Sequence, residues 1–129
     1  MRELITSARI AAPRFRYTPC VRSGPLGFVS GMVALDPDTG LLVDGGIGAQ
    51  TQRIFDNLLL ALPDYGFTLG ELCLARVYTT RFEQFAELNQ AWERQFADVA
   101  PPARTSIGVS ALPLGALVEI EFVFVSERQ

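Results

Sequence analysis

Apolar side chains are spaced along much of the chain as they are in strands. Runs of apolar and β-branched residues predict strands in the following segments. They are Arg2–Ile10, Leu26–Leu35, Leu41–Val43, Leu72–Thr80, Thr105–Leu112 and Leu117–Val125. The segment DPDTG, Asp36–Gly40, carries proline, aspartate and glycine in the order of a turn. It therefore predicts a hairpin between the strands on either side of it.

Two segments change to helical spacing. In GGIGAQTQRIFDNLLLALPDYG an apolar stripe recurs at every fourth residue. The stripe consists of Ile54, Leu58 and Leu62. We expect Pro63 and Gly66 to end this helix. A second helix is predicted over Phe82–Phe96, with its large apolar side chains along one side, and Ala100–Pro102 stops it.

This order of elements predicts an α+β fold. Hairpins favour a single antiparallel or mixed sheet, with both helices on one face. Because side chains alternate along a strand, the last strand presents two different faces. One face holds Val118, Ile120, Phe122 and Phe124, and the other holds Glu119, Glu121, Val123 and Val125. Both faces carry apolar side chains, so we expect the second face to meet another subunit in an oligomer.

Length and composition indicate one globular domain, residues 1–129. The chain is 49% hydrophobic and 19% charged, enough to build a core. Its net charge of −3 argues against nucleic acid as a partner. All 11 basic side chains are arginine, which excludes Schiff-base chemistry through lysine. The chain has no histidine and two cysteines, so neither a histidine base nor a metal site is expected.

The two cysteines and the N-terminus bear on location. Cys20 and Cys73 could pair, but in a chain with an ample core they are more often buried thiols. The first residues lack the pattern of a signal peptide, and no apolar run has the length of a membrane span. We therefore expect a cytoplasmic protein without a membrane partner.

Three charges stand out in the apolar C-terminal run. Arg104 opens a strand, and its position alone favours solvent exposure or an ion pair; the alternative is a fork that grips a substrate carboxylate. Glu119 lies within a strand, where a glutamate is usually exposed or in an ion pair. The alternative is a carboxyl group with a raised pKa that holds a water molecule and transfers a proton. Glu121 is on the same face, and the pattern does not separate the two.

Other polar residues are weaker candidates. Ser106 has no histidine or lysine to activate it, so it is expected to bond a ligand and not to act as a nucleophile. Tyr17 lies in a loop-like stretch and is either an anchor or part of a pocket. Ser30 and Gly31 offer backbone at close approach, or mark a bulge. Asn89, inside the second helix, either lines a cleft or is exposed.

Three segments resemble those of one family. PPARTSIGVSALPLGALVEIEFV is similar to the C-terminal signature of the Rid family, also called the YjgF family, which is roughly PARS-x-V-x-V-x-x-LP-x-x-x-x-VEIE. FVSGMVALDPDTG is similar to its SGQ-x-x-x-x-P-x-TG segment, and AQTQRIFDNLLLAL to its Q-x-x-x-x-x-N helix. The resemblance covers nearly the whole chain.

The resemblance implies a chorismate-mutase-like fold of the Bacillus type, assembled as a homotrimer with clefts between subunits. It implies hydrolysis, without a cofactor, of imines and enamines such as 2-iminobutanoate and 2-iminopropanoate to 2-keto acids and ammonia. Arg104 matches the arginine that binds the substrate carboxylate, and Glu119 matches the glutamate that positions water and transfers protons. Tyr17, Gly31 and Asn89 match pocket positions.

The chain also departs from the family pattern. RFRYTPC replaces a GPYSQ-like motif, Met32 replaces the glutamine after SG, and Ser106 stands where many members have cysteine. These departures at positions expected to bind substrate bear on substrate size more than on reaction class. Two alternatives stay open: a related deaminase or hydrolase for a bulkier enamine of the aminoacrylate or aminomuconate type, and a non-catalytic module that binds small carboxylates at the trimer cleft.

Overall fold

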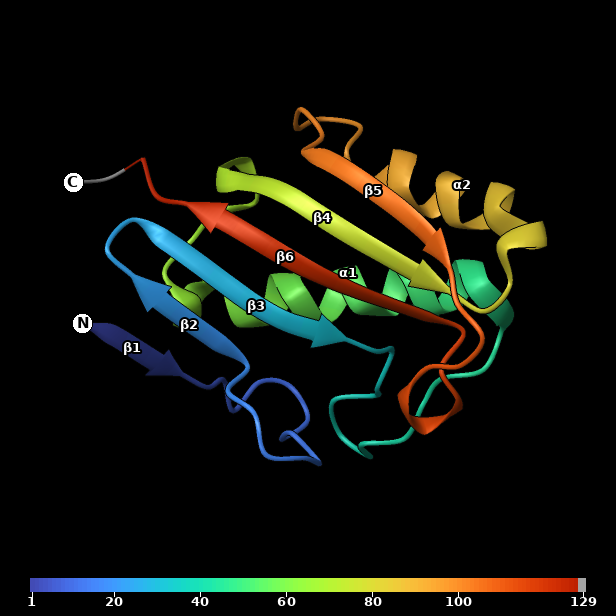
Figure 1. Cartoon of the computed structure of the whole chain (residues 1–129), viewed down its shortest axis with the longest axis horizontal. Coiled ribbons are helices and arrows are strands. Elements are labelled where there is room, and N and C mark those ends of the chain that lie inside the picture. Colours follow the sequence, from blue (N-terminus) through green and yellow to red (C-terminus); the bar gives the residue numbers. More distant parts are fainter. Residues whose placement is uncertain (128–129) are drawn as a thin grey trace.

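The computed structural model describes residues 1–127, which form one mixed sheet with two α-helices (Figure 1). The strand order is β1-β2-β3-β6-β4-β5. The strands are β1 (Arg2–Ile5), β2 (Cys20–Ser23), β3 (Leu26–Met32), β4 (Leu72–Thr79), β5 (Ala103–Gly108) and β6 (Val118–Val125). The helices are α1 (Gly46–Tyr65) and α2 (Phe85–Gln95), with short 3-10 turns η1 (Leu69–Glu71), η2 (Phe82–Gln84) and η3 (Pro113–Gly115).

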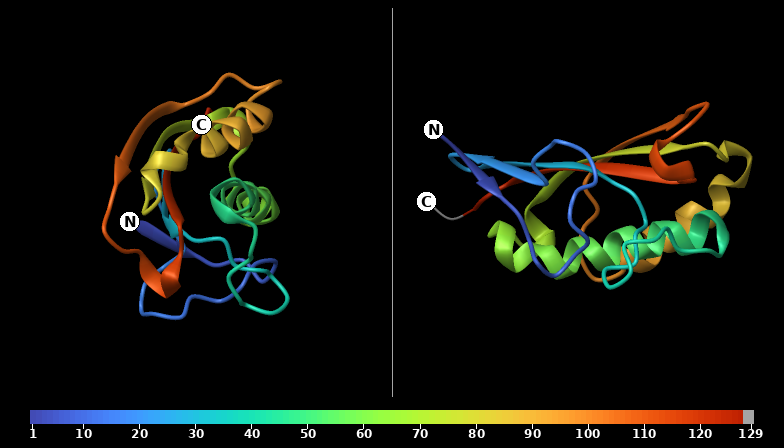
Figure 2. Two further views of the ribbon diagram at one scale, coloured as in Figure 1. Left: turned by 90° about the vertical axis from the view of Figure 1, so that its right-hand side faces the viewer. Right: turned by 90° about the horizontal axis from the view of Figure 1, so that it is seen from below.

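Strand directions follow from the connections. Neighbouring strands are antiparallel except for β4 and β5, which are parallel. Parallel strands need a long crossover, and α2 supplies it between β4 and β5. Both helices lie on the same side of the sheet (Figure 2). The predicted α+β class, with one mixed sheet and two helices on one face, is therefore confirmed.

The core lies between the helices and the inner face of the sheet. Every second side chain of β6 is buried there, and these are Val118, Ile120, Phe122 and Phe124. The ring of Phe55 on α1 meets Trp92, Phe96 and Phe122 edge to face, at centroid distances of 5.8, 5.6 and 5.7 Å. Because these rings come from α1, the α2 region and β6, one cluster holds both helices to the sheet.

The N-terminal half pairs differently from the prediction. The expected hairpin after Leu26–Leu35 forms only as a short one. Leu35 and Leu42 make an isolated antiparallel bridge, flanked by backbone hydrogen bonds from Asp36 to Leu41 and from Val43 to Ala34, and Leu41–Val43 is not a strand of the sheet. Instead β3 pairs with β2 and with β6. The turn Asp36–Gly40 does form, since the Asp36 carboxylate accepts the backbone N–H groups of the next turn residues at 2.8 and 2.9 Å. The turn leads into a loop because both edges of β3 are already paired.

Several predicted boundaries also shift. β1 ends at Ile5 instead of Ile10, and β5 covers Ala103–Gly108 instead of Thr105–Leu112. The first turn of the second predicted helix is the 3-10 turn η2, so α2 begins only at Phe85.

Helix α1 runs past the proline that was expected to end it. Pro63 lies inside α1, and the helix ends two residues later, at Tyr65, with Gly66 as its C-cap. Gly66 has φ 80°, and its N–H donates to the carbonyl of Leu62 at 2.9 Å. Glycine reaches this left-handed conformation without steric strain, so it forms the C-cap. Within residues 1–127 no helix is long and apolar enough to cross a membrane.

The outer face of the sheet, which the helices do not cover, carries exposed apolar side chains beside the charged pair Arg76–Glu121. Phe28 on β3 lies beside Val123 on β6, and Ile107 on β5 beside Tyr78 on β4. Phe28 is 46% exposed and Ile107 is 45% exposed. This face matches the second apolar face that was predicted for the last strand.

The orientation of α1 can be tested with neighbouring leucines. Leu58 is fully buried, whereas Leu59 is 41% exposed. We expect Leu58→Ala to lower the free energy of unfolding by about 2–5 kcal/mol through lost burial and a cavity. Leu59→Ala, the matched control, should lower it by less than about 1 kcal/mol. Urea unfolding measures both, and equal losses would contradict the packing of α1.

Candidate functional site

Glu119 sits on the outer face of the sheet, against the backbone of β3. A Cβ atom at position 31 would lie 2.6 Å from Oε2 of Glu119, so a larger residue there would displace the carboxylate from its present position. The register between β3 and β6 shifts between Val29 and Met32, which is the bulge that one interpretation of this segment predicted. Gly31 and Glu119 are therefore positioned together.

A hollow of about 260 Å³ opens beside this carboxylate. Tyr17, Ser30, Gly31 and Glu119 all line it, so the structure brings four of the predicted site residues together. Met32 lines a smaller adjoining hollow that shares three of these residues.

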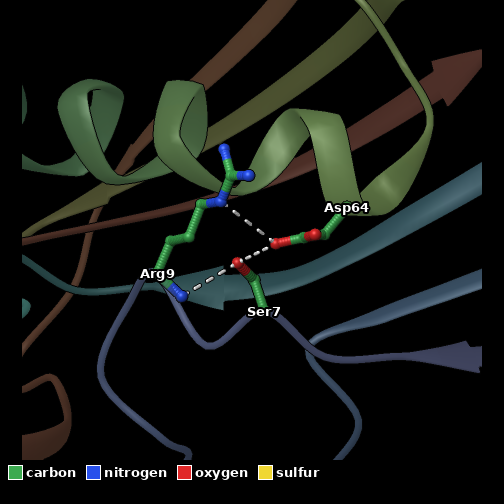
Figure 3. Close-up of polar contacts among 3 residues, drawn as sticks. All are labelled: Ser7, Arg9 and Asp64. Carbon is green, nitrogen blue, oxygen red and sulfur yellow. Dashed lines mark hydrogen bonds and ion pairs between the residues drawn. The ribbon is translucent and has the colours of Figure 1, made fainter.

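The segment that carries Tyr17, residues 6–19, is held in place by polar contacts. Ser7 donates a hydrogen bond to Asp64 on α1 at 2.5 Å, and the backbone N–H of Arg9 donates to Ser7 Oγ at 3.2 Å (Figure 3). Arg9 Nε also lies 3.9 Å from the Asp64 carboxylate (Figure 3). The beginning of the segment is thereby tied to the end of α1.

Ser30 fixes the other end of the same segment. Its hydroxyl donates to the carbonyl of Thr18 at 2.6 Å, and its backbone N–H donates to the carbonyl of Pro19 at 2.9 Å. The hydroxyl proton is thus used within the protein. Ser30 lines the hollow, and it also places Tyr17 over it.

The surroundings of Glu119 stabilise the neutral form of its carboxyl group relative to the same group in bulk water. Half-burial raises the pKa of the Glu119 carboxyl group, and the negative charge of Glu121 raises it further. Glu121 itself accepts a hydrogen bond from Tyr78 Oη at 2.6 Å and lies 3.5 Å from Arg76 Nη1. The two glutamates that the sequence pattern did not separate thus differ: Glu121 is paired, and Glu119 faces the hollow. Burial, and then Glu119, raise the pKa of Tyr17.

Arg104 belongs to a second cluster, at the edge strand β5. Its Nη1 donates to Asn89 Oδ1 on α2 at 2.9 Å. The guanidinium carbon lies 4.8 Å from the ring centroid of Trp92 and 5.3 Å from that of Phe85. Two aromatic rings and an amide hold the guanidinium in one orientation, and desolvation by its surroundings lowers its pKa. The remaining N–H groups can still take a carboxylate.

Ser106 joins this second cluster. It pairs with Val77 in the parallel ladder, two residues after the Ala75–Arg104 pair, so it shares a sheet face with Arg104. Its Oγ is buried, and no described residue is its hydrogen-bond partner. A buried hydroxyl without a partner is costly, which makes this atom a candidate to bond a ligand.

Within one chain, the two clusters lie on opposite faces of the sheet. Arg104 is paired with Ala75, whereas Glu119 is paired with Tyr78, three residues further along β4. Paired residues point to the same face and successive residues to opposite faces. The chain therefore does not bring Arg104 and Glu119 together by itself.

The sequence did not predict that some residues of both clusters belong to the site. Phe85 and Trp92 were interpreted only as core residues, yet with Asn89 they follow an i, i+4, i+7 spacing that puts them on one helix face. Arg14, Phe15 and Leu114 line the hollow of Glu119, and nothing in the sequence pattern indicated this. Within residues 1–127 no group of three or more cysteine, aspartate or glutamate side chains could hold a metal ion.

A family model described as Endoribonuclease L-PSP matches residues 6–126. The chain belongs to this family, the Rid or YjgF family. A RutC family protein of Aquifex aeolicus is 37% identical over 126 residues, which are 97% of this chain and 99% of that protein. Membership of the Rid family supports a general role in imine deamination or small-molecule binding.

Solved structures of the Rid family have the same fold. YyfA from Yersinia pestis, a protein of the conserved Rid family, has a TM-score of 0.92 and 28% identity over 97% of this chain and 99% of that chain. The YjgF gene product of E. coli has a TM-score of 0.90 and 26% identity over 98% of this chain and 99% of that chain.

The raised pKa of Glu119 leads to a prediction that does not depend on the reaction. Glu121→Gln keeps a hydrogen-bond acceptor for Tyr78 but removes the second negative charge, so the pKa of Glu119 should fall toward its usual 4.5. Carboxyl ¹³C NMR against pH measures this, and Glu119→Gln identifies the resonance. A titration midpoint that is unchanged in Glu121→Gln would contradict the coupling.

Proposed function

We propose that this protein hydrolyses reactive 2-imino and enamine acids, such as 2-iminobutanoate and 2-iminopropanoate, to 2-keto acids and ammonia. One observation carries the proposal: a half-buried carboxyl group of raised pKa lines an open hollow, while a guanidinium is held ready at a sheet edge. The reaction requires one group that binds a carboxylate and one that exchanges a proton with water.

The separation of the two clusters supports a site that is shared between subunits. The proposal is a homotrimer in which the outer apolar faces of the sheets pack together. Arg104 of one protomer then completes the hollow beside Glu119 of its neighbour. Burial of Phe28, Ile107 and the residues around them supplies the driving force for this assembly.

Each protein group in the proposed mechanism has one task. Arg104 binds the substrate carboxylate through two parallel hydrogen bonds, and Asn89 keeps the guanidinium in place. Glu119 accepts a proton from a water molecule while the oxygen of that water molecule bonds to C2 of the imine. The protonated Glu119 then gives this proton to the nitrogen and takes the proton of the new hydroxyl group, so that the C=O bond forms as the C–N bond breaks. Ammonia leaves and takes up the proton held by Glu119 as ammonium.

No histidine is needed for these steps. A protonated imine is already electrophilic, so the main requirement is to orient one water molecule. A carboxylate with a raised pKa accepts a proton more readily than an ordinary one. In this proposal Tyr17 and Ser106 bond the substrate, Ser30 and Gly31 shape the pocket wall, and Met32 contributes apolar surface. No cofactor takes part.

Location and substrate size belong to the same proposal. Cys20 and Cys73 are both free thiols, which fits the reducing cytoplasm. The second candidate is a deaminase for a bulkier enamine, because the hollow of about 260 Å³ is open on the outer face and leaves room for a longer substrate. A non-catalytic binder of small carboxylates would use the same residues without accelerating hydrolysis.

Hydrolysis of an imine generated in place tests the proposal directly. An amino-acid oxidase supplies 2-iminobutanoate, and trapping with semicarbazide follows its loss. The wild type should accelerate the loss, whereas Arg104→Ala should reduce kcat/KM by about 100-fold because a charge-assisted bidentate contact is removed. Glu119→Gln should lower kcat. Full activity in either variant would contradict its proposed role.

Mixing two inactive variants tests the location of the site. If each site combines Arg104 of one protomer with Glu119 of the next, co-assembly of Arg104→Ala with Glu119→Gln chains restores intact sites. Random mixing should restore about a quarter of the wild-type activity. The double variant mixed with either single variant is the control, and it should restore none. No recovery in the first mixture would contradict a site that is shared between protomers.

The trimer is tested by adding charge to the outer face. Phe28 is 46% exposed on the outer face, whereas Leu41 is 63% exposed in the loop after β3. We expect Phe28→Arg to give monomers in light scattering, because an arginine would be desolvated in the interface. Leu41→Arg should remain a trimer. A wild type that is monomeric at micromolar concentration would contradict the assembly.

A further inference from the structure

The segment before Tyr17 places a second arginine at the wall of the Glu119 hollow. Arg14 and Phe15 both line this hollow. The guanidinium of Arg14 donates a hydrogen bond to the carbonyl of Gly40, which ties residues 6–19 to the turn after β3. The arginine is therefore held at the hollow and does not extend freely into solvent.

Arg14 has N–H groups that are not used in hydrogen bonds to the described residues. Its side chain is exposed, and among residues 1–127 no ion pair joins it to an acid. A guanidinium carries five N–H donors, and the Gly40 carbonyl accepts from one of its nitrogens. Within the described chain, Arg14 is also the only basic residue that lines this hollow, and Glu119 is the only acidic one.

Arg14 and Glu119 both line the hollow, and within residues 1–127 no ion pair joins them. The causes that shift the pKa of Glu119 are its burial and Glu121, and both raise it. A guanidinium in contact with Glu119 would lower that pKa instead. Most of the other residues that line the hollow are apolar, with Phe15 and Leu114 among them.

We propose that Arg14 makes the site selective for 2-imino acids whose side chain ends in a second carboxylate. This inference deepens the proposed function and rests on it. Arg104 of the neighbouring protomer takes the carboxylate next to the imine, and C2 lies at Glu119. The methylene groups of the side chain lie along Phe15 and Leu114, and the distal carboxylate pairs with Arg14. A substrate with a short apolar side chain leaves that guanidinium unused.

The proposed selectivity is measured by comparing the hydrolysis of two imines. The oxidase reaction is run with 2-aminobutanoate and with glutamate, which give 2-iminobutanoate and 2-iminoglutarate. The ratio of their kcat/KM values is the selectivity. Arg14→Gln should lower the selectivity for the dicarboxylic imine by about tenfold or more, through loss of a charge-assisted hydrogen bond. Arg14→Lys should retain part of it.

Arg16→Gln is the matched control. Arg16 is an exposed arginine two residues away that does not line the hollow, so its variant should keep the wild-type rates and selectivity. Unchanged selectivity in Arg14→Gln would overturn the inference. So would a wild type that prefers the monocarboxylic imine.

Binding of the stable products separates this inference from the proposed reaction. Calorimetry compares 2-oxoglutarate with 2-oxobutanoate on the same variants. If no imine is hydrolysed faster but 2-oxoglutarate binds more tightly in an Arg14-dependent way, the deaminase proposal fails and the role of Arg14 stands. If both imines are hydrolysed with a selectivity that ignores Arg14, the deaminase proposal stands and the role of Arg14 fails.

Discussion

Strand β6 pairs with β3 on one side and with β4 on the other, so its backbone is fixed along both edges. Because its side chains alternate between the two faces, the register of β6 determines both the centre of the core and the position of Glu119. One set of side chains is buried under α1 and α2 and forms the centre of the core. The other set puts Glu119 beside Gly31 on the outer face. A slip of one residue would expose Phe122 and bury the carboxylate, so the packing of the core also determines the position of the candidate base.

The sequence predicted the fold class and both helices because their signals are local. Apolar spacing of about four residues is visible within one segment, and so is the alternation of β6. The pairing of strands is not local. β2, Cys20–Ser23, was missed because four residues that include an arginine and a serine show no clear alternation. The hairpin after Leu26–Leu35 was predicted from a correct turn, yet the competing partner of β3 is β6, more than eighty positions away in the sequence. Local turn chemistry carries no information about such a competition.

The candidate site was predictable to the extent that its motifs are contiguous. Arg104 and Glu119 stand in one C-terminal run, and the structure gives each a defined environment. That they lie on opposite faces depends on their separate registers with β4, which one sequence does not reveal. The contacts of Phe85 and Trp92 with Arg104 arise from the packing of α2 against β5, which the sequence alone does not show. Arg14 could not have been found, because its place at the hollow depends on the path of an irregular segment.

The absence of histidine limits how this fold can make a base near neutral pH. A carboxyl group on the surface of a sheet ionises at about pH 4 and is a weak proton acceptor above that. Burial and a second carboxylate shift its pKa in the needed direction, and both are present at Glu119. The second carboxylate, Glu121, is held in place by Tyr78 and Arg76. Burial by one chain is only partial, so closure of the outer face by a neighbouring subunit would desolvate Glu119 further. Assembly would then complete the site in two ways, by adding a guanidinium and by removing water from the base.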